Sequence, residues 1–376
     1  MPTLSPPDKV LVTGANGYVG CWVVHFLLDR GYSVRATVRS AEKARALTAL
    51  MAKKHSSPGV MDALECAVVP DIAAEGAFEK SLDGVQGVVH TATPVTFDLD
   101  DPEDYIRPAL EGTMGILKSA AKHRCVALNA MTASDIKRIV VTSSIGAVGE
   151  STISVEKTRV YTEEDWNEYA VRLVREIGAK ASGISKYNAS KVLSEQAAWR
   201  YYRENKDALP YELSVIAPGW ILGPLPDDPP SPSAFSTPSA KLEWEQLFAT
   251  PPPPEPFPSF PFSYVDIRDV AEMHVRALEM EEAAGERFIA CSLVCMWQDW
   301  FDAARALNIL PGLNKLHATT MRQRGAELRP HLVFSGDKAR QKLGIVYKTV
   351  PETLKDLVED FSSHGWLRHL EEPCTT

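Results

Sequence analysis

The chain has 376 residues, of which 45% are hydrophobic and 24% charged, as is typical of a globular protein with a large core. Its 40 basic and 49 acidic residues give a formal net charge of −9, which argues against a general nucleic-acid or anionic-membrane surface. No signal peptide, stretch of membrane-span length or prenylation box is visible, so we expect a cytoplasmic protein with no membrane partner. The six cysteines are scattered and no histidine cluster accompanies them, which predicts reduced thiols and no metal site.

The first motif is a strand, a glycine-rich turn and a helix, in that order. Residues 10–12 are apolar, Gly14, Gly17 and Gly20 follow at a spacing of three, and helical periodicity runs from Cys21 to Arg30. In such a turn the first glycine permits the bend, the second lets a ligand approach the backbone, and the third lets the helix pack on the strand. The partly positive helix N-terminus suits a pyrophosphate. The motif predicts a dinucleotide site; the alternative is an ordinary turn without a ligand.

The second expected strand, Tyr32 to Val38, ends at a basic residue rather than an acidic one. A carboxylate at this place would accept hydrogen bonds from the ribose 2′-hydroxyl of NAD, whereas the forked guanidinium of Arg39 can grip a 2′-phosphate. Lys43 follows within the first turn of a helix expected over Ala41 to Lys54. We therefore expect NADP(H), selected mainly by Arg39. The alternative is a solvated arginine at the start of a surface helix.

Strands and helices continue to alternate through the first half of the chain. We expect strands over residues 64–69, 85–90 and 138–142, a helix over 104–123 and a surface loop over 124–135. The nearly continuous Val and Ile runs of the strands predict an α/β fold, a Rossmann-type doubly wound parallel sheet covered by helices on both faces. Ligands of such sheets bind at the carboxyl ends of the strands. The expected site therefore gathers the glycine turn, Arg39, Asp71, Thr91–Pro94 and Thr142–Ser144.

Two residues near these strand ends have more than one interpretation. Asp71 is placed to reach an adenine amino group or, equally, to cap its own loop. His90 is expected to be a buried supporting residue rather than a catalyst.

A serine, a tyrosine and a lysine form the expected catalytic group. Ser144 follows the strand that ends at residue 142, and Tyr187 and Lys191 lie four residues apart on a helix expected from Lys186 to about Arg203, so they share one face. A nearby ammonium favours the phenolate, so we expect Lys191 to lower the pKa of Tyr187 from its ordinary value near 10. Ser144 is placed to donate a hydrogen bond to the same substrate oxygen. The group predicts hydride transfer to a carbonyl, with Tyr187 as proton donor.

Three segments, Thr13–Gly20, Thr142–Ser144 and Tyr187–Lys191, together resemble the extended short-chain dehydrogenase/reductases. Further matches at His90–Val95 and Pro218–Pro224 are similar to dihydroflavonol reductases and to fungal NADPH-dependent aldehyde and ketone reductases. The resemblance covers most of residues 8–365 and implies Ser144, Tyr187 and Lys191 as catalytic residues. It also implies cofactor contacts from Gly14, Asn16, Gly17, Tyr18, Val19, Arg39, Lys43, Asp71, Ile72, Thr91, Ala92, Thr93, Thr142, Ser143, Tyr187, Lys191, Pro218, Gly219 and Ile221.

The chain departs from this resemblance in one helix. Residues 108–118 contain no Asn that could join a proton relay of the kind found in many relatives, and Glu111 and Thr113 occupy the region. A relay through Asn is therefore not expected.

We assign residues 1–217 to the dinucleotide-binding core and 218–376 mainly to a smaller substrate-binding lobe, with elements that return to the core. Residues 224–261 are rich in proline and aromatic residues, and we interpret them as a lid or wall over an apolar substrate. The alternatives are a stiff linker or a proline-rich ligand of a partner domain. We expect Asp266 or Asp269 to cap a helix. Further elements are expected over 211–217, 240–249, 288–291, 297–307 and 351–361.

The expected activity is NADPH-dependent reduction of an aldehyde, ketone or keto ester with an apolar or aromatic group. The second half of the chain offers no charged clamp for a sugar nucleotide, although a hydroxysteroid dehydrogenase or a nucleotide-sugar epimerase or dehydratase would use the same Tyr187 and Lys191. An epimerase or dehydratase would prefer an acidic residue where Arg39 stands. A non-enzymatic NADP-sensing regulator is a further alternative. We expect a small-molecule carbonyl substrate, no nucleic-acid partner, and a monomer or homodimer.

Overall fold

The computed structural model describes residues 3–57, 59–127, 136–150, 157–227, 229–235, 237–251, 261–310 and 332–371. Its centre is a seven-stranded sheet in the order β10-β7-β5-β4-β1-β2-β3, in which every neighbouring pair is parallel. The strands are β1 (Lys9–Thr13), β2 (Ser33–Val38), β3 (Leu64–Val68), β4 (Gly87–His90), β5 (Arg138–Thr142), β7 (Glu212–Pro218) and β10 (Glu286–Ala290). The prediction of a doubly wound α/β fold is confirmed.

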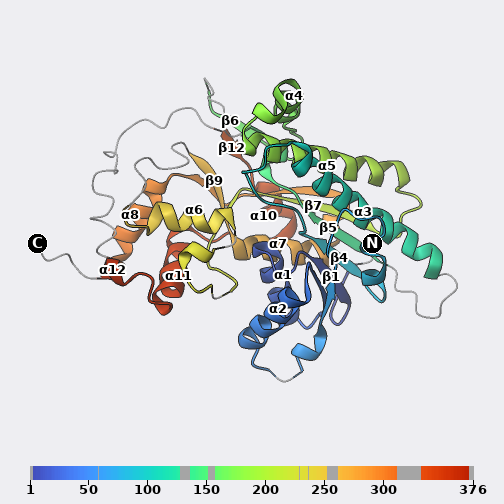
Figure 1. Ribbon diagram of the computed structural model, residues 1–376, viewed down its shortest axis with the longest axis horizontal. Helices are drawn as coiled ribbons and strands as arrows, with labels where there is room; N and C mark the ends of the chain where they lie inside the picture. The colour runs from blue at the N-terminus through green and yellow to red at the C-terminus, as the bar shows by residue number, and fades with distance from the viewer. Residues whose placement is uncertain are drawn as a thin grey trace, which may run out of the picture.

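Alternate side chains of the central strands enter two different cores, one on each face of the sheet. Val10 and Val12 of β1 pack in a core with α1 (Tyr18–Asp29) and α7 (Ile267–Glu279), whereas Leu11 packs in a core with α3 (Glu103–Ala127) and α5 (Gly183–Asn205). Figure 1 shows α3 and α5 on one side of the sheet, and α1, α7 and α2 (Ala41–Lys54) on the other. With both faces covered, the carboxyl ends of the strands are the edge where this fold binds ligands.

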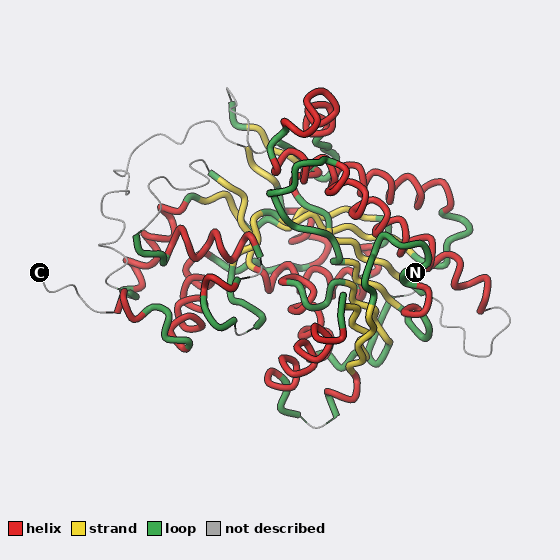
Figure 2. The backbone as a smooth tube through the Cα atoms, in the orientation of Figure 1, coloured by secondary structure: helices red, strands yellow, loops and turns green. Residues whose placement is uncertain are grey.

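A smaller lobe follows β7, at the left in Figures 1 and 2. Its three-stranded sheet has the order β11-β9-β8. It contains β8 (Trp220–Leu222), β9 (Phe262–Asp266), β11 (Leu293–Cys295), α6 (Pro238–Leu247), α8 (Trp297–Leu307), α11 (Val350–Ser363) and α12 (Arg368–Glu371). Three later elements return to the large sheet: α7 packs on one face of it, β10 pairs with β7, and α10 (Asp337–Leu343) packs against β10.

The described aromatic residues of the proline-rich segment belong to the core of this lobe. Phe235 and Phe248 are buried, and the rings of Phe235, Trp244 and Phe248 pack against Phe361 and Trp366 with centroids 5.5–6.3 Å apart. These contacts hold α6 against α11. Residues 252–260, the middle of the expected lid, lie outside the described residues.

Several elements differ from the sequence prediction. Helix α3 continues through Ala127, so the first part of the expected 124–135 loop is helical, and residues 128–135 lie outside the described ones. The prediction missed α4 (Glu168–Ile177) and the two short strands β6 (Arg159–Tyr161) and β12 (Leu332–Phe334), which pair in parallel. The short 3₁₀ helices are η1 (Met61–Ala63), η2 (Glu79–Leu82), η3 (Ile145–Ala147), η4 (Gly178–Lys180), η5 (Pro232–Ala234) and η6 (Glu281–Ala283).

The structure also bears on three smaller predictions. Asp266, not Asp269, caps α7, and its carboxylate accepts a hydrogen bond of 2.8 Å from the Arg268 amide. The four described cysteines, Cys21, Cys66, Cys291 and Cys295, are free thiols. Among the described residues, no helix has both the length and the apolar character that crossing a membrane requires.

Candidate active site

The glycine turn is held against the end of β4 at very short range. Gly14 has a φ of +65°, and a Cβ at this position would lie 2.9 Å from the Ala92 Cα. A Cβ on Gly20 would lie 2.4 Å from the carbonyl oxygen of Gly14. Gly17 is the N-cap of α1 and has no side chain to bond the first amides, and the first turn of α1 contains no acidic residue. The turn therefore leaves a bare, partly positive helix end, which suits a phosphate group.

A hydrogen-bond network around Thr13 fixes this turn to β4. The Thr13 hydroxyl lies 2.8 Å from Nδ1 of His90 and accepts a bond of 3.2 Å from the Ala92 amide, and the Thr91 hydroxyl donates to the Thr13 carbonyl at 2.6 Å. Burial, together with the charge of Lys191, lowers the pKa of His90 to about 3. A neutral, buried His90 thus supports the turn, in agreement with the role expected from the sequence.

Two cationic side chains stand at the end of β2 and the start of α2. Arg39 and Lys43 are both exposed, and neither makes an ion pair within the part of the chain that the structure describes. Asp71 is exposed as well, and its carboxylate accepts a hydrogen bond of 2.9 Å from the Ala73 amide, which is the loop cap considered from the sequence. Ile72 packs on Gly112 of α3. The contacts of these residues with a cofactor stay predictions.

The expected catalytic residues come together at the ends of β5 and α5. The Ser144 hydroxyl accepts a bond of 3.0 Å from the Gly146 amide, and its interaction with the Tyr187 phenol lowers the pKa of that phenol. Lys191, one turn further along α5, is buried, and its Nζ lies 5.8 Å from the centre of the Tyr187 ring. The Lys191 ammonium donates to the Thr142 carbonyl at 3.4 Å. Serine, phenol and ammonium thus lie around one point at the carboxyl edge of the sheet.

The pKa of Tyr187 differs from the sequence prediction. Burial raises the pKa of Tyr187 to about 12, and the interaction with Ser144 only partly offsets this. Burial also lowers the pKa of Lys191 to about 8, although the nearby Glu195 carboxylate raises it. The prediction of a lowered pKa was wrong because burial removes the hydration of the charged phenolate, and this loss raises the pKa by more than the interaction with Ser144 lowers it.

The Thr142 and Ser143 hydroxyls are already bonded within the protein. The Thr142 hydroxyl lies 2.7 Å from Nε2 of His274 on α7, and the Ser143 hydroxyl donates to Glu195 at 2.6 Å. Contacts of these two residues with a cofactor stay predictions. Ser144 is the residue of this run whose hydroxyl influences the pKa of Tyr187.

The sequence analysis missed a buried ion pair that joins Glu195 of α5 to Arg287 of β10. Oε1 of Glu195 lies 2.6 Å from Nε of Arg287, and the two side chains are 1% and 6% exposed. Glu195 also accepts hydrogen bonds from Ser143 and from the Trp199 indole. The signal available in the sequence was the position of Glu195, one turn after Lys191 on the same helix. Nothing local pointed to Arg287, which is 92 residues away.

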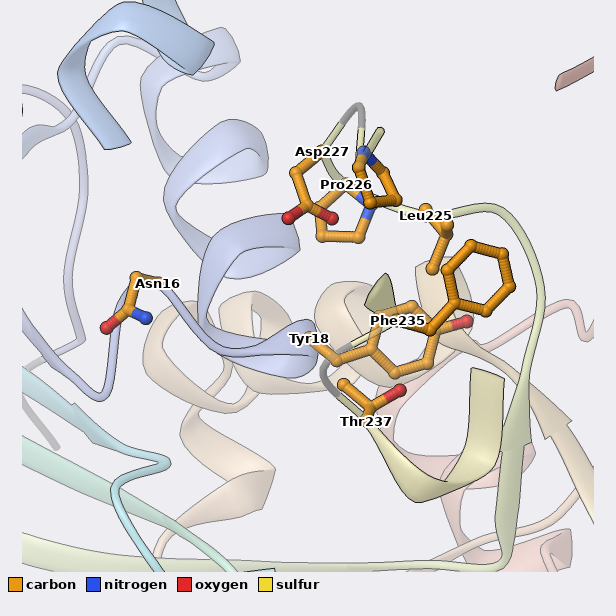
Figure 3. Close-up of a pocket in the computed structure, with 8 residues that line it drawn as sticks. Asn16, Tyr18, Leu225, Pro226, Asp227, Phe235 and Thr237 are labelled. Atoms are coloured by element: carbon orange, nitrogen blue, oxygen red, sulfur yellow. The ribbon is translucent and has the colours of Figure 1, made fainter. Parts of the chain in front are cut away.

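The start of the smaller lobe closes on the glycine turn. The Tyr18 hydroxyl donates to the Gly223 carbonyl at 2.6 Å and so ties the turn to the lobe, while contact of Tyr18 with a cofactor stays a prediction. Figure 3 shows the cleft between the turn and the lobe, lined by Asn16, Tyr18, Leu225, Pro226, Asp227, Pro229, Phe235 and Thr237. Val19 and Ile221 pack at the edge of the core.

Pro218 and Gly219 form the junction between the sheet and the lobe. Pro218 pairs with Ala290 of β10, and the Gly219 amide donates to the Ala290 carbonyl at 2.9 Å. A Cβ on Gly219 would lie 2.5 Å from the Ser263 carbonyl oxygen, so this position has room for glycine alone.

An aromatic side chain stands beside the phenol of Tyr187. The Phe97 ring meets the Tyr187 ring edge to face, with centroids 5.6 Å apart and an interplanar angle of 88°. The loop that carries Phe97 is held to α5 by the Lys186 ammonium, which donates to the Leu99 carbonyl at 3.2 Å. The chain thus places an apolar surface next to the expected proton donor.

Comparison with known proteins identifies the family. The pattern of the NAD dependent epimerase/dehydratase family matches residues 10–235. The chain belongs to this family. This epimerase/dehydratase-family chain is 30% identical to the NADPH-dependent methylglyoxal reductase GRE2 of Saccharomyces cerevisiae over 93% of its length and 96% of the relative's. It is 31% identical to the cinnamoyl-CoA reductase CAD2 of Medicago truncatula, over 94% and 95% of the two chains.

Solved structures of the family share the whole fold. The crystal structure of yeast Gre2, complexed with NADPH, superposes with a TM-score of 0.77 at 28% sequence identity and covers 95% of this chain and 99% of its own. The predicted membership of the extended short-chain dehydrogenase/reductases is therefore confirmed.

Proposed function

We propose that this chain is an NADPH-dependent reductase of aldehydes or ketones. The observation that carries the proposal is the grouping of Ser144, Tyr187 and Lys191 at the edge of the sheet that also holds the glycine turn. The relatives GRE2 and CAD2 bear the names of a methylglyoxal reductase and a cinnamoyl-CoA reductase, which supports a carbonyl substrate.

The residues present fit an NADP cofactor. The bare start of α1 suits the pyrophosphate, and the exposed Arg39 and Lys43 suit a 2′-phosphate. The Thr93 hydroxyl is buried and has no hydrogen-bond partner among the described residues, so it is available to a ligand at this edge. Since a buried hydroxyl without a partner is costly, a bound ribose or amide group would satisfy it. The reduced nicotinamide supplies the hydride when the cofactor is bound.

The proton step belongs to the chain's own side chains. Because the pKa of Tyr187 is raised to about 12, the phenol holds its proton at neutral pH and is ready to donate it to the substrate oxygen. The Ser144 hydroxyl is placed to bond the same oxygen and to stabilise the charge that develops on it. The Lys191 ammonium stabilises the phenolate that remains after the transfer.

The surface beside the phenol favours a substrate with an apolar group. Phe97 lies edge-on to Tyr187, and its loop is fixed to α5 through Lys186. An aromatic or aliphatic substituent on the carbonyl carbon can pack on this ring. We therefore propose an apolar or aromatic aldehyde, ketone or keto ester as substrate.

The test is oxidation of NADPH by a panel of aromatic aldehydes and α-keto esters. Tyr187→Phe removes the proton and should lower kcat/KM by about 10²- to 10⁴-fold, the usual contribution of a general acid. The matched control is Tyr169→Phe, an exposed tyrosine of α4, which should leave kcat/KM unchanged.

Two results would contradict the proposal. If the wild-type protein binds NADPH yet reduces no member of the panel, the proposed substrate class is wrong. If Tyr187→Phe and the wild type react at equal rates, the proposed mechanism is wrong.

A further inference from the structure

A second group of chemically active side chains lies toward the far end of α1, away from the glycine turn. His25 and Asp29 are one turn apart on α1, and His55 is the C-cap of α2. Nδ1 of His25 lies 2.9 Å from Nε2 of His55, and the ring centroids are 4.8 Å apart. The sequence spacing gave no hint of this group, because His55 is 30 residues from His25.

The other two ring nitrogens of this pair face one carboxylate. Nε2 of His25 lies 3.6 Å from Oδ2 of Asp29, and Nδ1 of His55 lies 3.2 Å from Oδ1. Asp29 is thus placed behind both imidazoles at once. A carboxylate that holds the outer nitrogen of an imidazole is the usual support of a histidine that binds a metal ion.

The spacing of the facing nitrogens is close to the spacing that a metal ion needs. Bonds from zinc to imidazole nitrogen are about 2.0–2.1 Å long, so two of them at the tetrahedral angle place the nitrogens about 3.3 Å apart, and the rings must part by about 0.4 Å to admit the ion. The distance between Nδ1 of His25 and Nε2 of His55 is 2.9 Å. Imidazole is a ligand for zinc, copper and nickel, whereas magnesium and calcium prefer oxygen.

We propose that His25 and His55 bind one divalent transition-metal ion of the zinc class through these facing nitrogens, with Asp29 as a positioning residue. The ion replaces the proton that the two rings share. That proton moves to the outer nitrogen of its own ring, where Asp29 accepts it as a hydrogen bond. No proton is released, no electron is transferred, and water completes the coordination.

The surroundings suit a partly enclosed site at the surface. The His55 side chain is 4% exposed, His25 19% and Asp29 53%, so the group lies near the surface and is only partly covered. The Trp22 ring packs edge-on against His25 with centroids 5.5 Å apart, and the Lys54 ammonium lies over Trp22, 5.1 Å from the ring centre.

The place of the site in the fold indicates its role. Helix α1 begins at the glycine turn, and α2 begins directly after Arg39 and Ser40. A metal ion at His25 and His55 would join these two helices at a distance from the catalytic residues. We therefore expect it to stabilise the fold around the dinucleotide site and to take no part in the reaction.

The test is calorimetric titration of the full chain, freed of metal by a chelator, with ZnCl₂. One zinc ion should bind per chain, and His25→Gln and His55→Gln should each abolish that binding. Asp29→Asn should weaken it by about 10- to 100-fold, the usual effect of losing a supporting carboxylate. The control is His123→Gln: Nδ1 of His123 lies 4.0 Å from Asp83, and this variant should bind as the wild type does.

A second measurement does not depend on how the variants fold. The electron paramagnetic resonance spectrum of the wild type with one equivalent of Cu²⁺ should show coupling to two imidazole nitrogens. A spectrum with one nitrogen or none, or unchanged zinc binding in folded His25→Gln, would overturn the proposal. Because neither readout involves NADPH, the outcome is independent of the reductase activity proposed above.

Discussion

The buried ion pair behind α5 allows the sharpest test of the packing around the site. Glu195→Gln keeps the shape of the side chain and removes its charge, while Arg287 stays buried. Removal of one partner from a buried ion pair costs about 3–5 kcal/mol, because the other charge is left uncompensated. Arg287 keeps its hydrogen bonds to the Glu163 and Asp165 carbonyls, at 3.0 and 2.6 Å, and lies 4.0 Å from the centre of the Trp166 ring.

Because of these remaining contacts, we expect the loss in the free energy of unfolding to lie at the lower end of this range, at about 3 kcal/mol. With an m-value of about 3 kcal/mol/M, the midpoint of urea unfolding should fall by about 1 M. The assay is urea unfolding followed by circular dichroism. The matched control is Glu168→Gln, an exposed glutamate of α4 that accepts a hydrogen bond from Gln196, and its effect should stay within about 0.5 kcal/mol. A loss under 1 kcal/mol for Glu195→Gln would refute the reasoning.

Three further predictions concern the cofactor, pH and the lobe junction. Arg39→Ala should reduce the preference for NADPH over NADH in kcat/KM by at least tenfold, whereas Arg45→Ala on the exposed side of α2 should not; an unchanged preference would remove Arg39 as the selector. Since the pKa of Lys191 is lowered to about 8 in the folded chain and is about 10.4 in the unfolded one, the unfolded state binds more protons between these values. The free energy of unfolding should therefore rise from pH 8 to 10 more steeply in the wild type than in Lys191→Met, and equal slopes would contradict the assignment. Gly219→Ala should lower the free energy of unfolding by about 2 kcal/mol, because the new Cβ clashes with the Ser263 carbonyl. An unchanged midpoint of urea unfolding would contradict this and would show that the backbone at the junction can shift to make room.

The large sheet was predictable from the sequence because each central strand is a short apolar run. Val10–Val12 and Ile139–Val141 are buried on both faces, which leaves a continuous hydrophobic signal. The pair β6 and β12 gave no such signal, since each is three residues long and their pairing joins segments about 170 residues apart. Such an element is specified by tertiary contacts and not by local pattern.

The position of the site was predictable from the sequence, but the pKa shifts of its residues were not. The rule that ligands bind at the carboxyl ends of parallel strands grouped the glycine turn with Ser144, and helical spacing added Tyr187 and Lys191. The direction of the Tyr187 pKa shift depends on burial, which the sequence does not give. His274, the partner of Thr142, lies on a distant helix and was equally out of reach, whereas Glu195, the partner of Ser143, lies one turn after Lys191 on the predicted helix.

The return of β10 to the large sheet has a consequence for dissecting this protein. A fragment that stopped at residue 217 would expose the hydrogen-bonding edge of β7, since β10 is the strand that covers it. Uncovered edges of that kind recruit other chains and lead to aggregation. The two halves of the polypeptide therefore cannot be exchanged as independent units. A chimera that joins a foreign lobe to this core must keep β10 with the core.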